Sequence, residues 1–154
     1  MPAADLAETL QRALPGVAIE SWDAVDQPVV VVPAAALVDA ARVLRDSPEL
    51  NFSFLAEMTA ADYWPKEPRF EVVYHLHCID RKERLRLKCR VAGDNSEIES
   101  VTGVWRGAGW YEREVFDLFG IKFLGNPDLR RILMPDDWEG HPLRKDYPIT
   151  GQRV

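Results

Sequence analysis

The stretch from Arg84 to Val91 alternates strictly between basic and apolar side chains. Successive side chains of a strand point to opposite faces, so this pattern predicts a strand with one face on a core and the other turned away. Residues 69–79 predict a partner strand, and the resulting hairpin turns at Asp80–Glu83. The apolar face of the second strand carries Leu85, Leu87, Cys89 and Val91, and its basic face carries Arg84, Arg86, Lys88 and Arg90.

A turn centred between Arg81 and Lys82 sets the register that we expect for this hairpin. The predicted opposite pairs are Leu76 with Leu87, Tyr74 with Cys89, Val72 with Val91, His75 with Lys88, His77 with Arg86 and Cys78 with Leu85. This register keeps the two cysteines apart, and we expect both to be reduced thiols. It also sets a basic side chain against each histidine, which favours a solvated or docking face over a metal site.

The remaining elements are predicted from hydrophobic periodicity and from proline and glycine boundaries. Helices are expected over residues 4–14, 33–46 and 104–119, and strands over 17–22, 29–32, 51–63 and 97–101. Two glycines weaken the start of the last helix, so we expect firm helix only near Trp110, with Gly120 as its C-cap. This order of elements predicts an α+β fold, with helices packed on a largely antiparallel sheet.

Beyond the last helix, four prolines exclude any long regular element and predict an irregular C-terminal extension. The extension is nonetheless rich in apolar and aromatic side chains, among them Leu133, Trp138 and Tyr147. Such a segment either folds back over its own domain or lies along another protein, and its arginines and aromatics favour a partner. We therefore expect a compact domain over residues 1–124 and a tail over 125–154 that docks on a partner subunit.

Three carboxylates, Glu112, Glu114 and Asp117, gather in the last helix, where they raise the question of an acid–base site. On a helix Glu114 and Asp117 share a face, Glu112 is rotated away, and Arg113 is spaced to pair with Asp117. A structural ion-pair cluster is therefore the favoured interpretation. No motif for phosphate, dinucleotide or iron–sulfur binding, or for a serine hydrolase, is present.

The chain as a whole carries a net charge of −6, which argues against binding to nucleic acid or to an anionic membrane surface. The first residues contain two acids and no basic stretch before an apolar run, so we expect no signal peptide. The longest apolar runs fall far short of the roughly 20 residues that a membrane-spanning helix needs. We therefore expect membrane association only through partner proteins.

The last third of the chain closely resembles one family signature. The matching stretches are Glu112–Ile121, which reads EREVFDLFGI, Pro127–Leu133, which reads PDLRRIL, and Gly140–Pro148, which reads GHPLRKDYP. The family is that of the C subunit of bacterial NADH-quinone oxidoreductase, equivalent to the 30 kDa subunit of respiratory complex I. One position departs from it, because the family usually has histidine before the second stretch and this chain has Asn126.

The resemblance implies a subunit without a redox centre of its own, in the peripheral arm on the cytoplasmic side of the bacterial inner membrane. FMN, iron–sulfur clusters, NADH and a quinone would be used by the complex, not bound by this chain. The implied partners are the D-like quinone-site subunit, which the extension would wrap, and the small, B-like, cluster-bearing subunit. The implied interface residues are Glu112, Arg113, Glu114, Asp117, Arg130, Arg131, Asp136, Asp137, Trp138, His141, Arg144, Lys145, Asp146 and Tyr147.

We therefore expect a structural, non-catalytic subunit of a proton-translocating NADH:quinone oxidoreductase, which braces the quinone-site subunit while electrons pass from NADH to quinone. A homologous subunit of a membrane-bound hydrogenase or related dehydrogenase complex is the alternative. An independent hydrolase or lyase that uses the carboxylates of residues 112–117 is a third hypothesis, from a different functional class.

Overall fold

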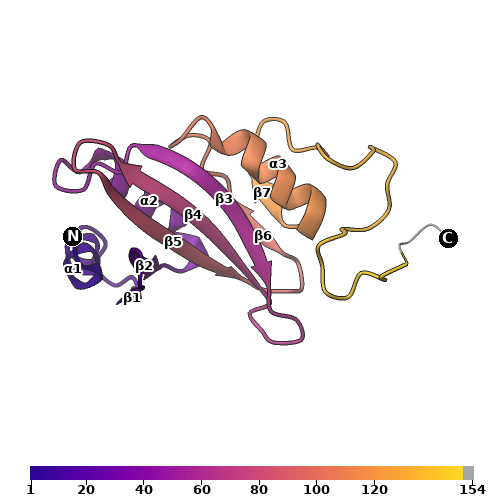
Figure 1. The fold of residues 1–154 in the computed structure, drawn as a ribbon, viewed down its shortest axis with the longest axis horizontal. Helices are drawn as coiled ribbons and strands as arrows, with labels where there is room; N and C mark the ends of the chain where they lie inside the picture. Colours follow the sequence, from indigo (N-terminus) through magenta and orange to yellow (C-terminus); the bar gives the residue numbers. More distant parts are fainter. Residues whose placement is uncertain (151–154) are drawn as a thin grey trace.

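Five strands form one mixed sheet in the order β1-β2-β5-β4-β3 (Figure 1). They are β1 (Glu20–Asp23), β2 (Pro28–Val31), β3 (Phe54–Asp62), β4 (Phe70–Cys78) and β5 (Glu83–Val91). Every neighbouring pair is antiparallel except β2 and β5, which run parallel. The computed structural model describes residues 1–150, and it confirms the predicted α+β fold with a largely antiparallel sheet.

Strands β4 and β5 form the predicted hairpin, but the predicted register is wrong by two residues. Tyr74 lies opposite Leu87 instead of Cys89, and His75 lies opposite Arg86 instead of Lys88. The turn occupies residues 79–82, where Lys82 adopts a positive φ of 55°. A shift of two residues leaves every side chain on its predicted face, so the alternation could not distinguish the two registers.

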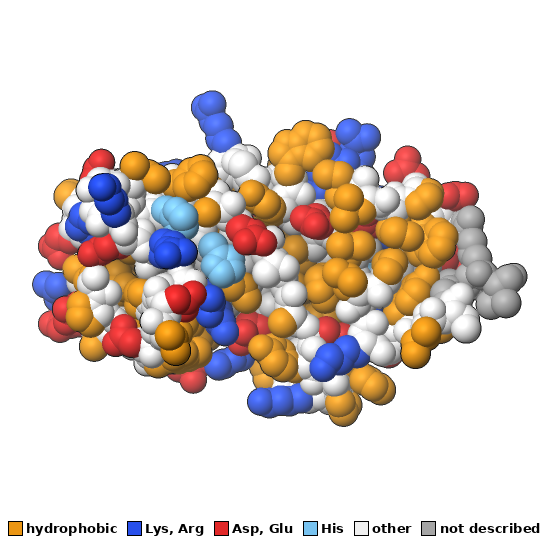
Figure 2. Space-filling view, viewed as in Figure 1, with side chains coloured by type: hydrophobic (Ala, Val, Ile, Leu, Met, Phe, Trp, Pro, Cys, Tyr) orange, Lys and Arg blue, Asp and Glu red, His pale blue; other side chains and the backbone are white. Residues whose placement is uncertain are grey.

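Helices α1 (Ala3–Ala13) and α2 (Leu37–Asp46) contribute to the core on one face of this sheet. A short 3-10 turn, η1 (Ala34–Ala36), leads into α2 after Pro33. The core contains Tyr74, Phe52 and Phe70, and it holds both cysteines as buried free thiols. The other face is open in part, and histidine side chains lie there beside basic ones (Figure 2).

Helix α3 (Ala108–Phe119) packs against β3, and its C-terminus is capped by Gly120, as predicted. The φ of Gly120 is +77°, a left-handed conformation, and its N–H donates to Phe116 O at 2.8 Å. Next to this helix, β6 (Glu97–Glu99) pairs in parallel with β7 (Lys122–Leu124) in a separate two-stranded sheet. The sequence predicted β6 within residues 97–101 and missed β7, which is too short to show a period.

After Leu124, residues 125–150 form no helix or strand and run beyond α3 as a long irregular segment (Figure 1). We call these residues the strap. Residues 151–154 of the predicted extension lie outside the described residues. The strap matters for function because it carries most of the signature residues, so the site is built at its contacts with α3.

Candidate functional site

The strap is tied to α3 by one fully buried carboxylate, Asp117. Its Oδ1 accepts a hydrogen bond from Nη1 of Arg131 at 2.7 Å. Its Oδ2 accepts the backbone N–H groups of residues 132–134 at 3.2, 2.7 and 2.8 Å. Burial by itself would raise the pKa of Asp117, but these donors outweigh it and lower the pKa. The carboxylate is therefore a charged anchor for the strap.

The last carbonyl groups of α3 also receive donors from the strap. A helix end leaves such carbonyls without partners inside the helix, so they must be satisfied from outside. Asp117 O accepts a hydrogen bond from Arg131 Nη1 at 3.1 Å and lies 2.9 Å from His141 Nδ1. Leu118 O accepts from Leu143 N at 2.9 Å. Phe119 O accepts from Arg144 Nε at 2.6 Å. Burial lowers the pKa of His141, which favours a neutral ring, and the carbonyl oxygen beside Nδ1 favours the tautomer that carries its proton there.

Arg131 also holds the strap in its curved path. Its Nη2 donates to Trp138 O and to Gly140 O, each at 2.9 Å. One guanidinium group thus joins the helix to two later points of the strap. This use matches the geometry of arginine, whose planar fork can serve several acceptors at once.

A second anchor joins the strap to the sheet. Arg69 is buried and forms ion pairs with Asp62 and Asp146, each with an N–O distance of 2.8 Å. Asp62 Oδ2 also accepts the backbone N–H of Lys145 at 2.8 Å. Burial alone would raise the pKa of Asp62, but the hydrogen bonds from Arg69, Lys145 N–H and Trp64 N–H lower it to about 2.

The predicted ion pair between Arg113 and Asp117 is wrong. Arg113 donates from Nε to Arg130 O at 3.2 Å and from Nη2 to Arg131 O at 3.0 Å, and its guanidinium lies over the ring of Trp110. Asp117 is paired with Arg131 instead. The helical spacing made Arg113 a reasonable partner, but the strap brings a better-placed guanidinium from outside the helix.

Glu112 forms a separate buried cluster on α3. Its carboxylate accepts from Ser100 Oγ at 2.6 Å, from Val101 N at 2.8 Å and from Asn126 Nδ2 at 2.9 Å. Burial raises the pKa of Glu112 and outweighs these three donors. The sequence predicted that Glu114 and Asp117 share a face and that Glu112 points away. In the structure, Glu112 and Asp117 are buried and Glu114 is exposed. None of the three is set against a second carboxylate as an acid–base pair requires.

The predicted interface residues separate into two groups. Glu112, Arg113 and Asp117 are buried in contacts within the chain, while Arg131, His141 and Arg144 are partly buried and bond to the end of α3. Trp138 and Tyr147 are partly buried as well. The exposed members are Glu114, Arg130, Asp136, Asp137, Lys145 and Asp146. Their role at an interface stays a prediction.

Sequence reasoning missed the anchor formed by Asp62 and Arg69 and the partner role of Ser100. Asp62 ends β3 and Arg69 directly precedes β4, on either side of a proline-rich loop whose sequence predicts turns but no ion pair. A charged residue at the inward position of a strand is the signal that could have found Asp62, because burial of such a residue demands a partner.

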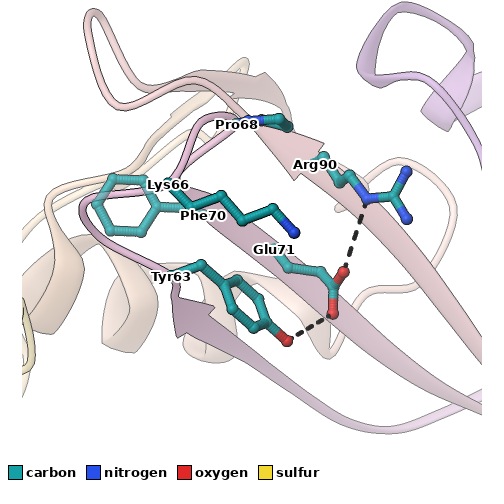
Figure 3. Close-up of a pocket in the computed structure, with 6 residues that line it drawn as sticks. All are labelled: Tyr63, Lys66, Pro68, Phe70, Glu71 and Arg90. Carbon is teal, nitrogen blue, oxygen red and sulfur yellow. Dashed lines mark hydrogen bonds and ion pairs between the residues drawn. The ribbon is translucent and has the colours of Figure 1, made fainter.

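A recess of about 410 Å³ opens at the end of β3–β5 near the proline-rich loop (Figure 3). Tyr63 points into it and donates to Glu71 Oε1 at 3.3 Å, while Arg90 lies 3.9 Å from Oε2 of the same carboxylate. Glu71 is also paired with Lys88 at 3.0 Å, so its charge is already matched. The recess therefore offers no activated nucleophile or free acid–base pair.

Within residues 1–150, no three His, Cys, Asp or Glu side chains gather as a set of metal ligands would. Among the same residues, none of the helices has the length and apolar character that crossing a bilayer demands.

Comparison with known proteins identifies close relatives. The family model for the 30 kDa subunit of respiratory-chain NADH dehydrogenase matches residues 30–153. The C subunit of NADH-quinone oxidoreductase from Roseiflexus sp. (strain RS-1) is 49% identical over 151 residues, which are 98% of this chain and 87% of that protein.

Two solved structures share the fold. A trypsin-resistant fragment of Nqo5 superposes with a TM-score of 0.66 at 30% identity, covering 82% of this chain and 98% of the fragment. A chain of the membrane-bound sulfane sulfur reductase, an archaeal respiratory membrane complex, superposes with a TM-score of 0.79 at 29% identity. That match covers 95% of this chain and 85% of the other.

Proposed function

The chain belongs to the family of the 30 kDa subunit of respiratory-chain NADH dehydrogenase, and from this premise we propose that it is a structural, non-redox subunit in the peripheral arm of a proton-translocating NADH:quinone oxidoreductase. It braces the quinone-site subunit while electrons pass from NADH to quinone. The strap carries this role. It is held rigidly at one side and leaves apolar side chains exposed on the other.

The exposed side of the strap supports docking on a partner. Leu133 and Leu143 are 60% and 53% exposed, although the backbone N–H of each is bonded to α3. A segment whose backbone is fixed loses little further conformational freedom when a partner covers it. Apolar side chains held in this way are suited to an interface core.

The state of the two buried carboxylates supports a role without catalysis by this chain. Asp117 and Glu112 each accept hydrogen bonds from several donors inside the protein. A catalytic acid or base has to reach a substrate proton, and these groups are covered. FMN, iron–sulfur clusters, NADH and the quinone are accordingly assigned to other subunits of the complex.

The proposed partners are the D-like quinone-site protein, along which the strap would lie, and the B-like cluster protein. The chain would be peripheral to the membrane, on its cytoplasmic side, and would reach the membrane only through the complex. Identity of 49% to a relative of this family along nearly the whole chain is the observation that carries this proposal.

The test is co-purification of the tagged chain with the enzyme from native membranes. Leu133→Asp and Leu143→Asp should each reduce the amount of NADH-oxidising activity recovered with the chain, because a carboxylate would be buried in the interface. Val25→Asp is the matched control, since Val25 is fully exposed in the turn between β1 and β2. Unchanged recovery with both strap variants would contradict docking through the strap.

The membrane-bound sulfane sulfur reductase favours a second candidate, a homologous subunit of a hydrogenase-type or related membrane complex. The same co-purification separates the two. An NADH-oxidising flavoprotein among the recovered proteins supports the first proposal, and a nickel-containing protein among them supports the second.

A further inference from the structure

A recess of about 290 Å³ lies between the first turns of α3 and the beginning of the strap. Its lining includes three arginine side chains: Arg106 and Arg113 come from the α3 side, and Arg130 comes from the strap. Trp110 forms part of the same wall. In Figure 2, hydrophobic side chains lie beside basic ones at this edge of the molecule, over α3 and the start of the strap.

The described part of the chain does not balance the positive charge of the recess. Among residues 1–150, Asp128 is the only acidic side chain that lines it, and it is paired with Arg130 at 2.9 Å. Arg106 is exposed and makes no hydrogen bond or ion pair with any described residue. Arg113 uses Nε and Nη2 for carbonyl groups and leaves its Nη1 without an acceptor among those residues. An excess of positive charge therefore gathers on a chain whose net charge is −6.

One wall of the recess, formed by Arg113 and Trp110, is held in place by contacts within the chain. The guanidinium of Arg113 lies 4.9 Å from the ring centre of Trp110, and two strap carbonyls hold it in place. Trp110 is 64% exposed, so a large aromatic surface stands beside the basic groups. Tryptophan and arginine are the residues most enriched at the energetic centres of protein interfaces. A preorganised pair of this kind loses little rotamer freedom on binding.

We propose that this recess binds an acidic segment of a partner subunit, whose carboxylate is held by Arg106 and Arg113 while its neighbouring side chains cover Trp110. This inference rests on the proposed function and extends it to a second contact, separate from Leu133 and Leu143. A carboxylate forms paired hydrogen bonds with a guanidinium, which gives the contact direction as well as charge. An anionic bilayer is the less favourable occupant, because it would repel the rest of an acidic chain.

The experiment uses the tagged full-length chain assembled in native membranes. Arg106→Glu and Trp110→Ala should each weaken retention in the complex at least about tenfold, measured as the concentration dependence of rebinding to membranes stripped of the native copy of this protein. Arg106→Lys keeps the charge without the planar guanidinium group, so its rebinding should be intermediate between that of the wild type and that of Arg106→Glu. Arg84→Glu is the matched control, because Arg84 is an exposed arginine on β5 at the opposite end of the fold.

Thermal unfolding of the isolated Arg106→Glu variant should match that of the wild type, since Arg106 forms no hydrogen bond or ion pair with residues 1–150. If the wild-type chain does not rebind at all, the proposed function fails. If the wild type rebinds and both Arg106→Glu and Trp110→Ala rebind equally well, only the recess inference is overturned. Binding of the wild type, but not of Arg106→Glu, to vesicles containing anionic lipid, with unchanged rebinding to the complex, would overturn it in favour of a lipid headgroup.

Discussion

Asp117 and Arg131 form a buried ion pair that joins the last helix to the strap, with 2.7 Å between Oδ1 and Nη1. The side chain of Asp117 has no exposed surface and that of Arg131 is 12% exposed. The pair is completed by the N–H groups of residues 132–134 on one side and by the carbonyls of Trp138 and Gly140 on the other. Both charges are therefore fully satisfied by the fold itself.

Replacement of Asp117 by Asn should lower the free energy of unfolding by about 3 kcal/mol, because it leaves the Arg131 charge buried without its partner. The measurement is urea denaturation followed by tryptophan fluorescence. Asp128→Asn is the control, since the ion pair of Asp128 with Arg130 is exposed and should contribute less than about 1 kcal/mol. Equal losses for the two variants would contradict the anchor.

The stability of the protein should fall at low pH, because the carboxylate of Asp62 becomes protonated. Its folded pKa of about 2 lies below the unfolded value, so the stabilisation is present above about pH 4 and disappears as the pH falls through 2. The difference between the folded and unfolded pKa values of Asp62 corresponds to about 2 kcal/mol of stability. Urea denaturation at a series of pH values gives the free energy of unfolding at each pH. Between pH 4 and pH 2 this free energy should fall less steeply for Asp62→Asn than for the wild type. Parallel curves for the two proteins would be inconsistent with a depressed pKa.

Gly120→Ala should destabilise the protein and loosen the strap. A side chain at φ +77° costs about 1 kcal/mol, and a Cβ there would lie 2.6 Å from the His141 ring and 2.8 Å from Arg144 Nη2. Faster proteolysis within the strap, together with a lower unfolding midpoint, is the expected result. Gly107→Ala should neither lower the midpoint nor speed proteolysis, since Gly107 has a φ of −66° and no described heavy atom near its added Cβ.

Asn126 donates a hydrogen bond to the buried Glu112. The effect of a substitution at residue 126 on stability should therefore depend on whether a donor remains there. Asn126→Ala should cost about 1 kcal/mol of unfolding free energy. Asn126→His restores an N–H donor, as the resemblance to the family suggests, and should cost less. Asn126→Asp sets a second carboxylate against Glu112 and should cost the most. Equilibrium unfolding ranks the variants, and equal values for Ala and His would show that the donor is unimportant.

Much of the fold followed from local patterns. The alternation in β5 assigned Leu85 and Leu87 to the core and Arg84 and Arg86 to the opposite face, and both assignments are confirmed. The pattern could not select the hairpin register, because a shift of two residues preserves the faces and the turn at 79–82 decides between them. The parallel pairing of β2 with β5 was not predicted either, since that contact joins strands that are distant in the chain.

The amino-acid sequence predicted the family, the class of fold and the end of the last helix at its glycine cap. It did so because periodicity, glycine placement and a long ordered signature are local properties of the chain. The pairing of Asp117 with Arg131 instead of Arg113, and the position of Arg69 between Asp62 and Asp146, became visible only in the folded structure. These partners are far apart in sequence, so no spacing rule relates them. They meet because the strap returns to α3 and to the end of the sheet.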